Sequence, residues 1–211
     1  MLLDWLRGVL RPRDAPLGAV QWAVLDCETS GLDMNAARLL SIGAVTIAEG
    51  RIGIGGAFEA VLRQSVESGA DNIVVHGIGG EAQRAGMPGA QALAAFERYA
   101  GQAILVAFHA PFDRVVLERA MRESRGAAWR GTWLDLAQLL PALYPPRART
   151  CKSLDDWLGA LGVRVELRHD ALADAFATGQ LLQVALAEAG RQGIVTLRGL
   201  LRLAADVRWA G

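Results

Sequence analysis

The order of the apolar runs is the feature that most constrains the fold of this chain. Three strand-like runs come first, and only Glu49-Gly50 separates the second from the third, which is a hairpin pattern. A fourth run is short, continuously apolar and enclosed between two helix patterns. The predicted strands are 19–27, 39–50, 51–62 and 103–108. This order predicts an α/β domain whose mixed sheet begins as an antiparallel meander and pairs its first and fourth strands in parallel.

Helix patterns dominate the second half of the chain, whereas the glycine-containing stretch 65–86 is predicted to be a loop. The predicted helices are 1–10, 90–102, 111–124, 133–144, 153–163, 170–190 and 196–209. We therefore expect three parts: an N-terminal helical extension and linker (1–18), a main domain (19–190) and a C-terminal amphipathic helix (191–211). The last either packs on the domain or docks on a partner.

Composition limits the class of protein. The 211 residues are 52% hydrophobic, which suits one domain with a full core. Lys and Arg number 22 and equal Asp and Glu, so the formal net charge of zero argues against a protein that coats long duplex nucleic acid. The two cysteines, Cys27 and Cys151, form no C-x-x-C pair, so a reducing cytoplasm is expected. No apolar stretch reaches the roughly 18 residues of a membrane span.

Two carboxylates end the first predicted strand, in "VLDCETSGLD". Asp26 and Glu28 are two residues apart, which in a strand aims both side chains at one face. Neighbouring carboxylates repel each other, and a divalent cation removes that repulsion. Ligands that are all oxygen favour Mg²⁺ or Mn²⁺ over zinc. Solvated acids at a strand end are the alternative, because D-x-E alone is a weak signal.

Three more polar residues stand where they can join the first two. Asp113 follows the fourth strand and opens a helix, so it lies near the same edge of the sheet. His169 is predicted to lie just before the last long helix, with Asp174 one turn into it. Each has a plain structural alternative: a first-turn acid that complements the helix dipole, a loop histidine, and a polar-face residue.

Four stretches together carry a resemblance to a known family. "DCETSG", "HAPFD" and "HDALADAFAT" resemble, in order, the three motifs of the DEDDh 3′–5′ exonucleases. "VVHGIGGE" is similar to a segment of the proofreading epsilon subunit of bacterial DNA polymerase III and its relatives. The stretches cover roughly residues 20–190. The resemblance implies a ribonuclease H-like fold, a mixed sheet with flanking helices, and makes 19–190 the exonuclease domain.

The resemblance also implies roles for individual residues. Two divalent ions, Mg²⁺ or Mn²⁺, would be held by four carboxylates: Asp26, Glu28, Asp113 and Asp174. His169 would be the general base on the attacking water, since an imidazole accepts a proton near neutral pH. Substrate contacts would come from Thr29, Leu32, His76 and Phe112, with Leu32 wedged against the terminal base.

Two departures from the family pattern bear on the site. The asparagine usual in the second motif is Ala110 here, so the loop that aims Asp113 is expected to be held differently. A D-T-L segment common in relatives is matched to "TWL" at 132–134, which puts Thr132 where the aspartate is expected. That aspartate is not a metal ligand of the family, so we expect the chemistry to be retained.

The leading functional prediction is a metal-dependent 3′–5′ exonuclease that acts on single-stranded 3′ ends, with DNA preferred. RNA 3′-end trimming is one alternative. A non-catalytic ribonuclease H-like module that binds nucleic acid or a polymerase is another. A polymerase or other protein partner would dock through the terminal helices, and no membrane partner is expected.

Overall fold

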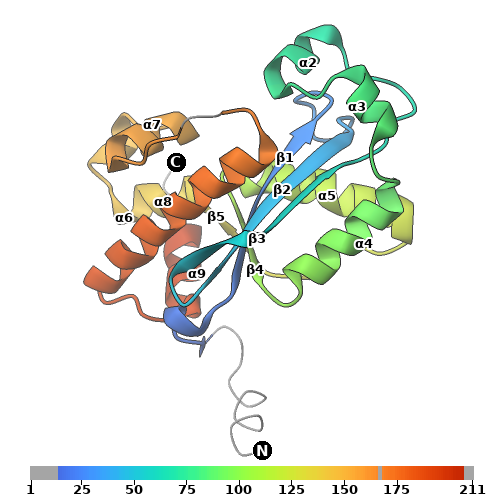
Figure 1. Ribbon diagram of the computed structural model, residues 1–211. Helices are drawn as coiled ribbons and strands as arrows, with labels where there is room; N and C mark the ends of the chain where they lie inside the picture. Colours follow the sequence, from blue (N-terminus) through green and yellow to red (C-terminus); the bar gives the residue numbers. More distant parts are fainter. Residues whose placement is uncertain (1–13, 166–167, 207–211) are drawn as a thin grey trace, which may run out of the picture.

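The computed structural model describes residues 14–165 and 168–206 (Figure 1). Within this part of the chain, one sheet has the strand order β3-β2-β1-β4-β5. The strands are β1 (Trp22–Thr29), β2 (Leu39–Ala48), β3 (Arg51–Val61), β4 (Ile104–Ala107) and β5 (Trp133–Asp135). Strands β1, β2 and β3 pair antiparallel, whereas β4 is parallel to β1 and β5 is parallel to β4. The predicted α/β mixed sheet that begins as an antiparallel meander is confirmed.

A two-residue turn connects β2 to β3. Ala48 pairs with Arg51, and the residues between them, Glu49 and Gly50, both have positive φ, 52° and 74°. Two left-handed residues form a type I′ turn, whose twist matches that of the flanking strands. The predicted hairpin across Glu49-Gly50 is confirmed.

Eight α-helices lie within the described residues. They are α2 (Ala70–His76), α3 (Gly80–Ala85), α4 (Gly89–Ala100), α5 (Ala110–Arg125), α6 (Leu136–Leu143), α7 (Leu154–Leu161), α8 (Ala171–Arg191) and α9 (Leu197–Asp206). The loop predicted at 65–86 is wrong, because α2 and α3 form there. These helices have 7 and 6 residues, too few for the apolar periodicity that identifies a helix in sequence.

The segment predicted as one helix at 133–144 is divided. Its first residues pair with β4 as strand β5, and only then does α6 begin. A sheet partner supplied by tertiary structure overrides the local helix pattern here.

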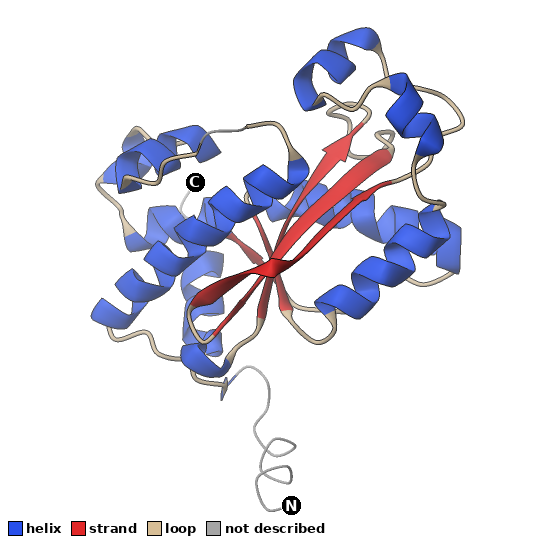
Figure 2. Ribbon diagram, viewed as in Figure 1, coloured by secondary structure: helices blue, strands red, loops and turns tan. Residues whose placement is uncertain are grey.

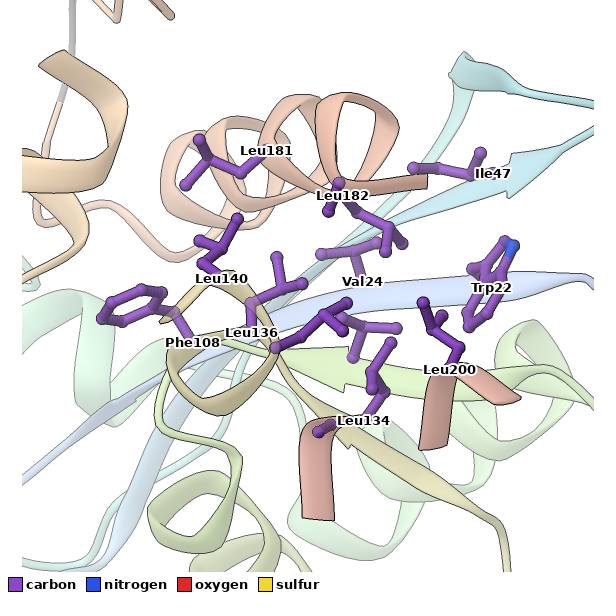
Figure 3. Packing of buried hydrophobic residues seen from close by; sticks show 14 of the residues in the cluster. Trp22, Val24, Ile47, Phe108, Leu134, Leu136, Leu140, Leu181, Leu182 and Leu200 are labelled. Carbon is purple, nitrogen blue, oxygen red and sulfur yellow. The ribbon is translucent and has the colours of Figure 1, made fainter. Parts of the chain in front are cut away.

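Helices cover both faces of the sheet, α8 with α6 and α9 on one and α4 with α5 on the other (Figure 2). Side chains of β1 alternate between the two cores. Trp22 and Val24 enter the α8-side core, where Figure 3 shows them with Leu181 and Leu182, whereas Ala23 and Leu25 enter the other core. By the same alternation, the next even-numbered residues of β1 belong to the α8 face.

The start of α8 lies directly on the sheet next to the end of β1. Gly43 on β2 pairs with Asp26, and a Cβ added at Gly43 would be 2.2 Å from the backbone carbon of Ala171. Only glycine permits so close an approach of helix backbone to strand backbone. Gly43 therefore sets the distance between β1 and the first turn of α8.

The C-terminal helix α9 packs on the domain. Leu197, Leu200 and Ala204 are buried in the core that α8 also covers. The predicted helix at 1–10 lies outside the described residues, as does the last part of 191–211. No helix in the described ranges is long and apolar enough to cross a membrane.

Candidate active site

Strand β1 carries two carboxylates to its C-terminal end on the α8 face. Asp26 and Glu28 are half-buried, whereas Cys27 between them is buried in the core on the α4 and α5 side. The alternation inferred from the sequence, with both acids on one face and the cysteine on the other, is what the structure has.

Helix α8 brings the third carboxylate to the first two. Asp174 lies in the first turn of α8 and is buried. One carboxylate oxygen from each of Asp26, Glu28 and Asp174 lies within 4.8 Å of the other two. Three acids from two distant segments thus form one cluster at the end of β1.

The fourth carboxylate approaches the cluster from the other side of β1. Asp113, in the first turn of α5, is 4% exposed, and its Oδ1 accepts a hydrogen bond of 3.1 Å from the backbone N–H of Cys27. Because Cys27 stands between Asp26 and Glu28, this bond fixes Asp113 against the strand that carries them. Ala110, which replaces the family's asparagine, is itself buried.

His169 lies just before α8, as the sequence predicts. It has φ of 61° and an exposed side chain, and its backbone N–H donates to Oδ2 of Asp174 at 3.2 Å. The helix is capped by Asp170, whose carboxylate accepts from the N–H of Ala173. The backbone of His169, which carries the imidazole, is thus hydrogen-bonded to one of the clustered acids.

Burial raises the pKa of three acids of the site, and for Asp26 the neighbouring carboxylates add to the effect. Burial raises the pKa of Asp26 well above its usual range, and the charges of Asp113 and Glu28 raise it further. Burial is also the main reason that the pKa of Glu28 is raised and that the pKa of Asp113 reaches about 7. Buried like charges at this spacing require a compensating positive charge.

A divalent cation fits this cluster chemically. All the side-chain donors are carboxylate oxygens, which hard ions such as Mg²⁺ and Mn²⁺ prefer. Bound cations would remove the repulsion that raises the pKa values of Asp26 and Glu28. Asp26, Glu28 and Asp174 are the residues placed to share one ion, with Asp113 beside them.

The turn after β1 presents Leu32 to solvent. Thr29 is buried, and its hydroxyl donates to the carbonyl of Gly31 at 2.8 Å, whereas the Leu32 side chain is 93% exposed. Arg119 of α5 holds the same loop by donating to the carbonyls of Met34, at 2.7 Å, and Ala37. The loop that exposes Leu32 is therefore fixed to the helix that carries Asp113.

The other two predicted substrate residues are engaged within the protein. His76 is buried, its Nδ1 accepts from the N–H of Ile78 at 2.9 Å, and its Nε2 lies 3.0 Å from Asn72 Oδ1. Phe112 packs partly buried against the core on the α5 side. Their contact with substrate stays a prediction.

Two residues that the sequence did not single out bear on the site. Oδ1 of Asp135, at the end of β5, accepts from the N–H groups of His109 and Ala137, each at 3.0 Å, so it joins the turn before α5 to the start of α6. An aspartate does therefore end the strand that "TWL" was matched to, one residue after Leu134.

The second residue that the sequence did not single out is Arg168, which pairs with Asp174 and with Asp155. Only the position of Arg168 next to His169 could have drawn attention to it.

Comparison with known proteins agrees with this geometry. The family model described as "Exonuclease" (RNase_T) matches residues 23–182. The chain belongs to this exonuclease family. The match spans β1 to α8 and includes every proposed metal ligand and His169. The predicted kinship with the DEDDh 3′–5′ exonucleases is confirmed.

Two curated relatives are DNA polymerase III proteins. The chain is 31% identical over 192 residues to a DNA polymerase III subunit epsilon-like protein of Rhodobacter capsulatus, an alignment that covers 89% of this chain and 27% of the relative. It is 29% identical over 168 residues to a PolC-type DNA polymerase III of Thermotoga maritima, covering 80% of this chain and 12% of the relative. The chain thus spans about a quarter or less of these relatives.

Solved structures share the fold at low identity. E. coli exonuclease I in complex with a dT13 oligonucleotide has a TM-score of 0.70 and 18% identity, over 82% of this chain and 42% of that one. Exonuclease X in complex with 5′ overhanging duplex DNA has a TM-score of 0.68 and 22% identity, over 87% of this chain and 99% of that one. The predicted ribonuclease H-like fold is confirmed.

Proposed function

We propose that this chain is a metal-dependent 3′–5′ exonuclease that hydrolyses phosphodiester bonds at single-stranded 3′ ends, with DNA preferred. The observation that carries the proposal is the approach of Asp26, Glu28 and Asp174 oxygens to within 4.8 Å of one another, with Asp113 bonded to the strand between them. Carboxylates held this close repel one another, and a bound divalent cation would remove that repulsion.

Each side chain has a distinct part in the proposed reaction. Asp26, Glu28, Asp113 and Asp174 would hold two divalent ions, which would lower the pKa of an attacking water and stabilise negative charge on the phosphate. His169 takes the proton of the attacking water, because an imidazole can act as a general base and the backbone N–H of His169 is bonded to Asp174. Leu32 contacts the terminal base from the loop that Thr29 and Arg119 hold.

Single-stranded DNA is the proposed substrate. The site requires only a few nucleotides, which suits a chain without net charge. One structural neighbour is described in complex with a dT13 oligonucleotide, and two relatives are DNA polymerase III proteins. Because these two relatives are DNA polymerase III proteins, we also propose that the chain associates with a polymerase.

A nuclease assay tests the function directly. Single-stranded DNA and RNA labelled at the 5′ end are incubated with the protein and Mg²⁺, Mn²⁺ or EDTA. We expect stepwise shortening from the 3′ end of DNA with either metal and none with EDTA. The matched control is Asp14→Asn, which alters an acid paired with Arg198 on the terminal helix and should behave as wild type.

The same assay separates the alternatives. Faster shortening of RNA than of DNA would support an RNA-trimming enzyme. Binding of either strand without shortening in any metal would reject the enzyme and support a non-catalytic nucleic-acid-binding module.

A further inference from the structure

Arg168 places a positive charge among the carboxylates of the candidate active site. Its Nη1 pairs with Asp174, and its Nε donates to Asp155 on α7 at 2.6 Å. The Arg168 side chain is 23% exposed, whereas Asp155 is 63% and Asp174 is 8% exposed. The guanidinium is thus held between a solvent-accessible acid and a buried one.

The two ion pairs of Arg168 differ in what competes for them. Asp174 belongs to the oxygen cluster proposed to hold metal, whereas Asp155 lies at the start of α7, outside that cluster. A cation bound by Asp174 would repel the Arg168 guanidinium and so weaken the ion pair between Arg168 and Asp174. The pair with Asp155 persists, so the guanidinium stays at the site with its Nη donors available to another acceptor.

Charge balance indicates which acceptor suits those donors. The four carboxylates and two divalent cations together carry no net charge, so the negative charge of a phosphodiester at the site is left uncompensated. Arg168 supplies one positive charge at the site, because its guanidinium pairs with Asp174 of the carboxylate cluster. A guanidinium also matches two phosphate oxygens with its fork of N–H donors.

We propose that Arg168 is a substrate-binding residue that donates hydrogen bonds from its Nη atoms to the phosphate at the 3′ end, while Asp155 holds the guanidinium in place. The inference rests on the proposed function and names a further residue of the same site. Its ligand is a phosphodiester oxygen, irrespective of the base attached.

Binding of oligonucleotides tests the proposal without relying on turnover. A fluorescent oligothymidine is titrated in Mn²⁺ by anisotropy, in a His169→Asn background that slows cleavage. A second oligothymidine has a neutral methylphosphonate at its 3′-terminal linkage. Arg168→Gln is expected to weaken binding of the ordinary strand by about 10- to 100-fold. It should weaken binding of the methylphosphonate strand much less, because the charge it would contact is absent.

Three further variants sharpen the result. Arg168→Lys keeps the charge but not the fork, so binding should fall by less than in Arg168→Gln. Asp155→Asn removes the charged partner that holds the guanidinium in place, and it should also weaken oligonucleotide binding by less than Arg168→Gln does. Arg198→Gln breaks an ion pair with Asp14 of 2.9 Å and should bind both strands as the parent does.

Two results would overturn the proposal. One is equal weakening of both strands by Arg168→Gln, which would mean that the terminal phosphate charge is not its partner. The other is loss of Mn²⁺ binding by Arg168→Gln in calorimetry without DNA, which would make Arg168 a support of the metal site. Failure of the wild-type protein to shorten DNA would instead reject the proposed function, and the binding comparison would still decide the role of Arg168.

Discussion

The starts of α5 and α8 are built alike but held differently. Each follows a histidine with a left-handed backbone, His109 with φ of 63° and His169 with φ of 61°, and each carries a buried aspartate in its first turn, Asp113 or Asp174. A non-glycine residue costs about 1–2 kcal/mol in this conformation, so both turns must be stabilised by their surroundings.

The stabilising contacts come from different places. The N–H of His109 donates to Asp135 on a neighbouring strand, and Asp113 accepts from the backbone of β1. The N–H of His169 donates to Asp174 of the helix that follows, and Asp174 pairs with Arg168 just before it. Hydrogen bonds from neighbouring strands therefore fix the start of α5, whereas the start of α8 packs on the sheet at Gly43 and draws its polar contacts mainly from its own segment.

The largest expected effect is loss of activity when either aspartate is neutralised. Asp113→Asn and Asp174→Asn should each lower the rate of 3′ shortening by about 10³-fold or more, because each removes a proposed metal ligand. Their stabilities should diverge. Above neutral pH, Asp113→Asn should raise the melting temperature of the metal-free protein, because the amide oxygen still accepts from Cys27 without a buried charge.

Asp174→Asn should not raise the melting temperature, because Arg168 loses its charged partner. Scanning fluorimetry in EDTA measures both values. Equal shifts in the two variants would contradict the difference drawn between the two helix starts.

The next largest effect is a difference between the two histidines in how much their substitution slows 3′ shortening. His169→Asn should slow shortening by about 10²–10⁴-fold while Mn²⁺ binding is retained, because only the general base is lost. Asparagine tolerates the left-handed backbone, which limits the structural cost. His109→Asn should change the rate little, since the His109 ring lies exposed against Phe108. A rate for His169→Asn equal to wild type would reject the assigned base.

A moderate effect is expected at Asp135. Asp135→Ser keeps a residue that caps α6 but shortens the side chain that reaches His109, so kcat should fall by about 10- to 100-fold with little change in KM. Asp135→Asn keeps the acceptor oxygen and should restore most of kcat.

The control for Asp135 is Thr196→Ala, which removes a cap of α9 formed with the N–H of Gly199. It should lower stability without lowering kcat. If Asp135→Ser and Thr196→Ala have the same kinetics, Asp135 serves only the stability of α6.

The smallest expected effect is on stability against pH. The pKa of Asp113 is raised from its ordinary 3.8 to about 7, so the folded state binds this proton more tightly than the unfolded state. The contribution of Asp113 to the melting temperature of the metal-free protein should therefore fall as pH rises between these values and level off above about 7. Mg²⁺ or Mn²⁺ should raise the melting temperature more above this range than below. A slope that is unchanged in Asp113→Asn would assign the effect to another group.

Much of this site was predictable because its chemistry is local in sequence. Strand alternation placed Asp26 and Glu28 on one face, and the element order placed Asp113 near them. The resemblance to the DEDDh motifs was needed to propose all four carboxylates, Asp174 included, as metal ligands. The short helices α2 and α3 and the strand at Trp133 were not predictable, since seven or fewer residues carry too little periodicity and depend on tertiary contacts.

By itself, the sequence determined the order of the first four strands, the hairpin at Glu49-Gly50 and the acidic residues that stand at the ends of a strand and two helices. Tertiary structure alone decided how these residues meet: Gly43 admits α8 to the sheet, Asp135 reaches His109 from β5, and Arg168 joins Asp155 to Asp174. The physical reason is that hydrophobic periodicity is set by neighbours in the chain. A backbone approach, a hydrogen bond or an ion pair between distant segments exists only after the sheet and its helices have packed.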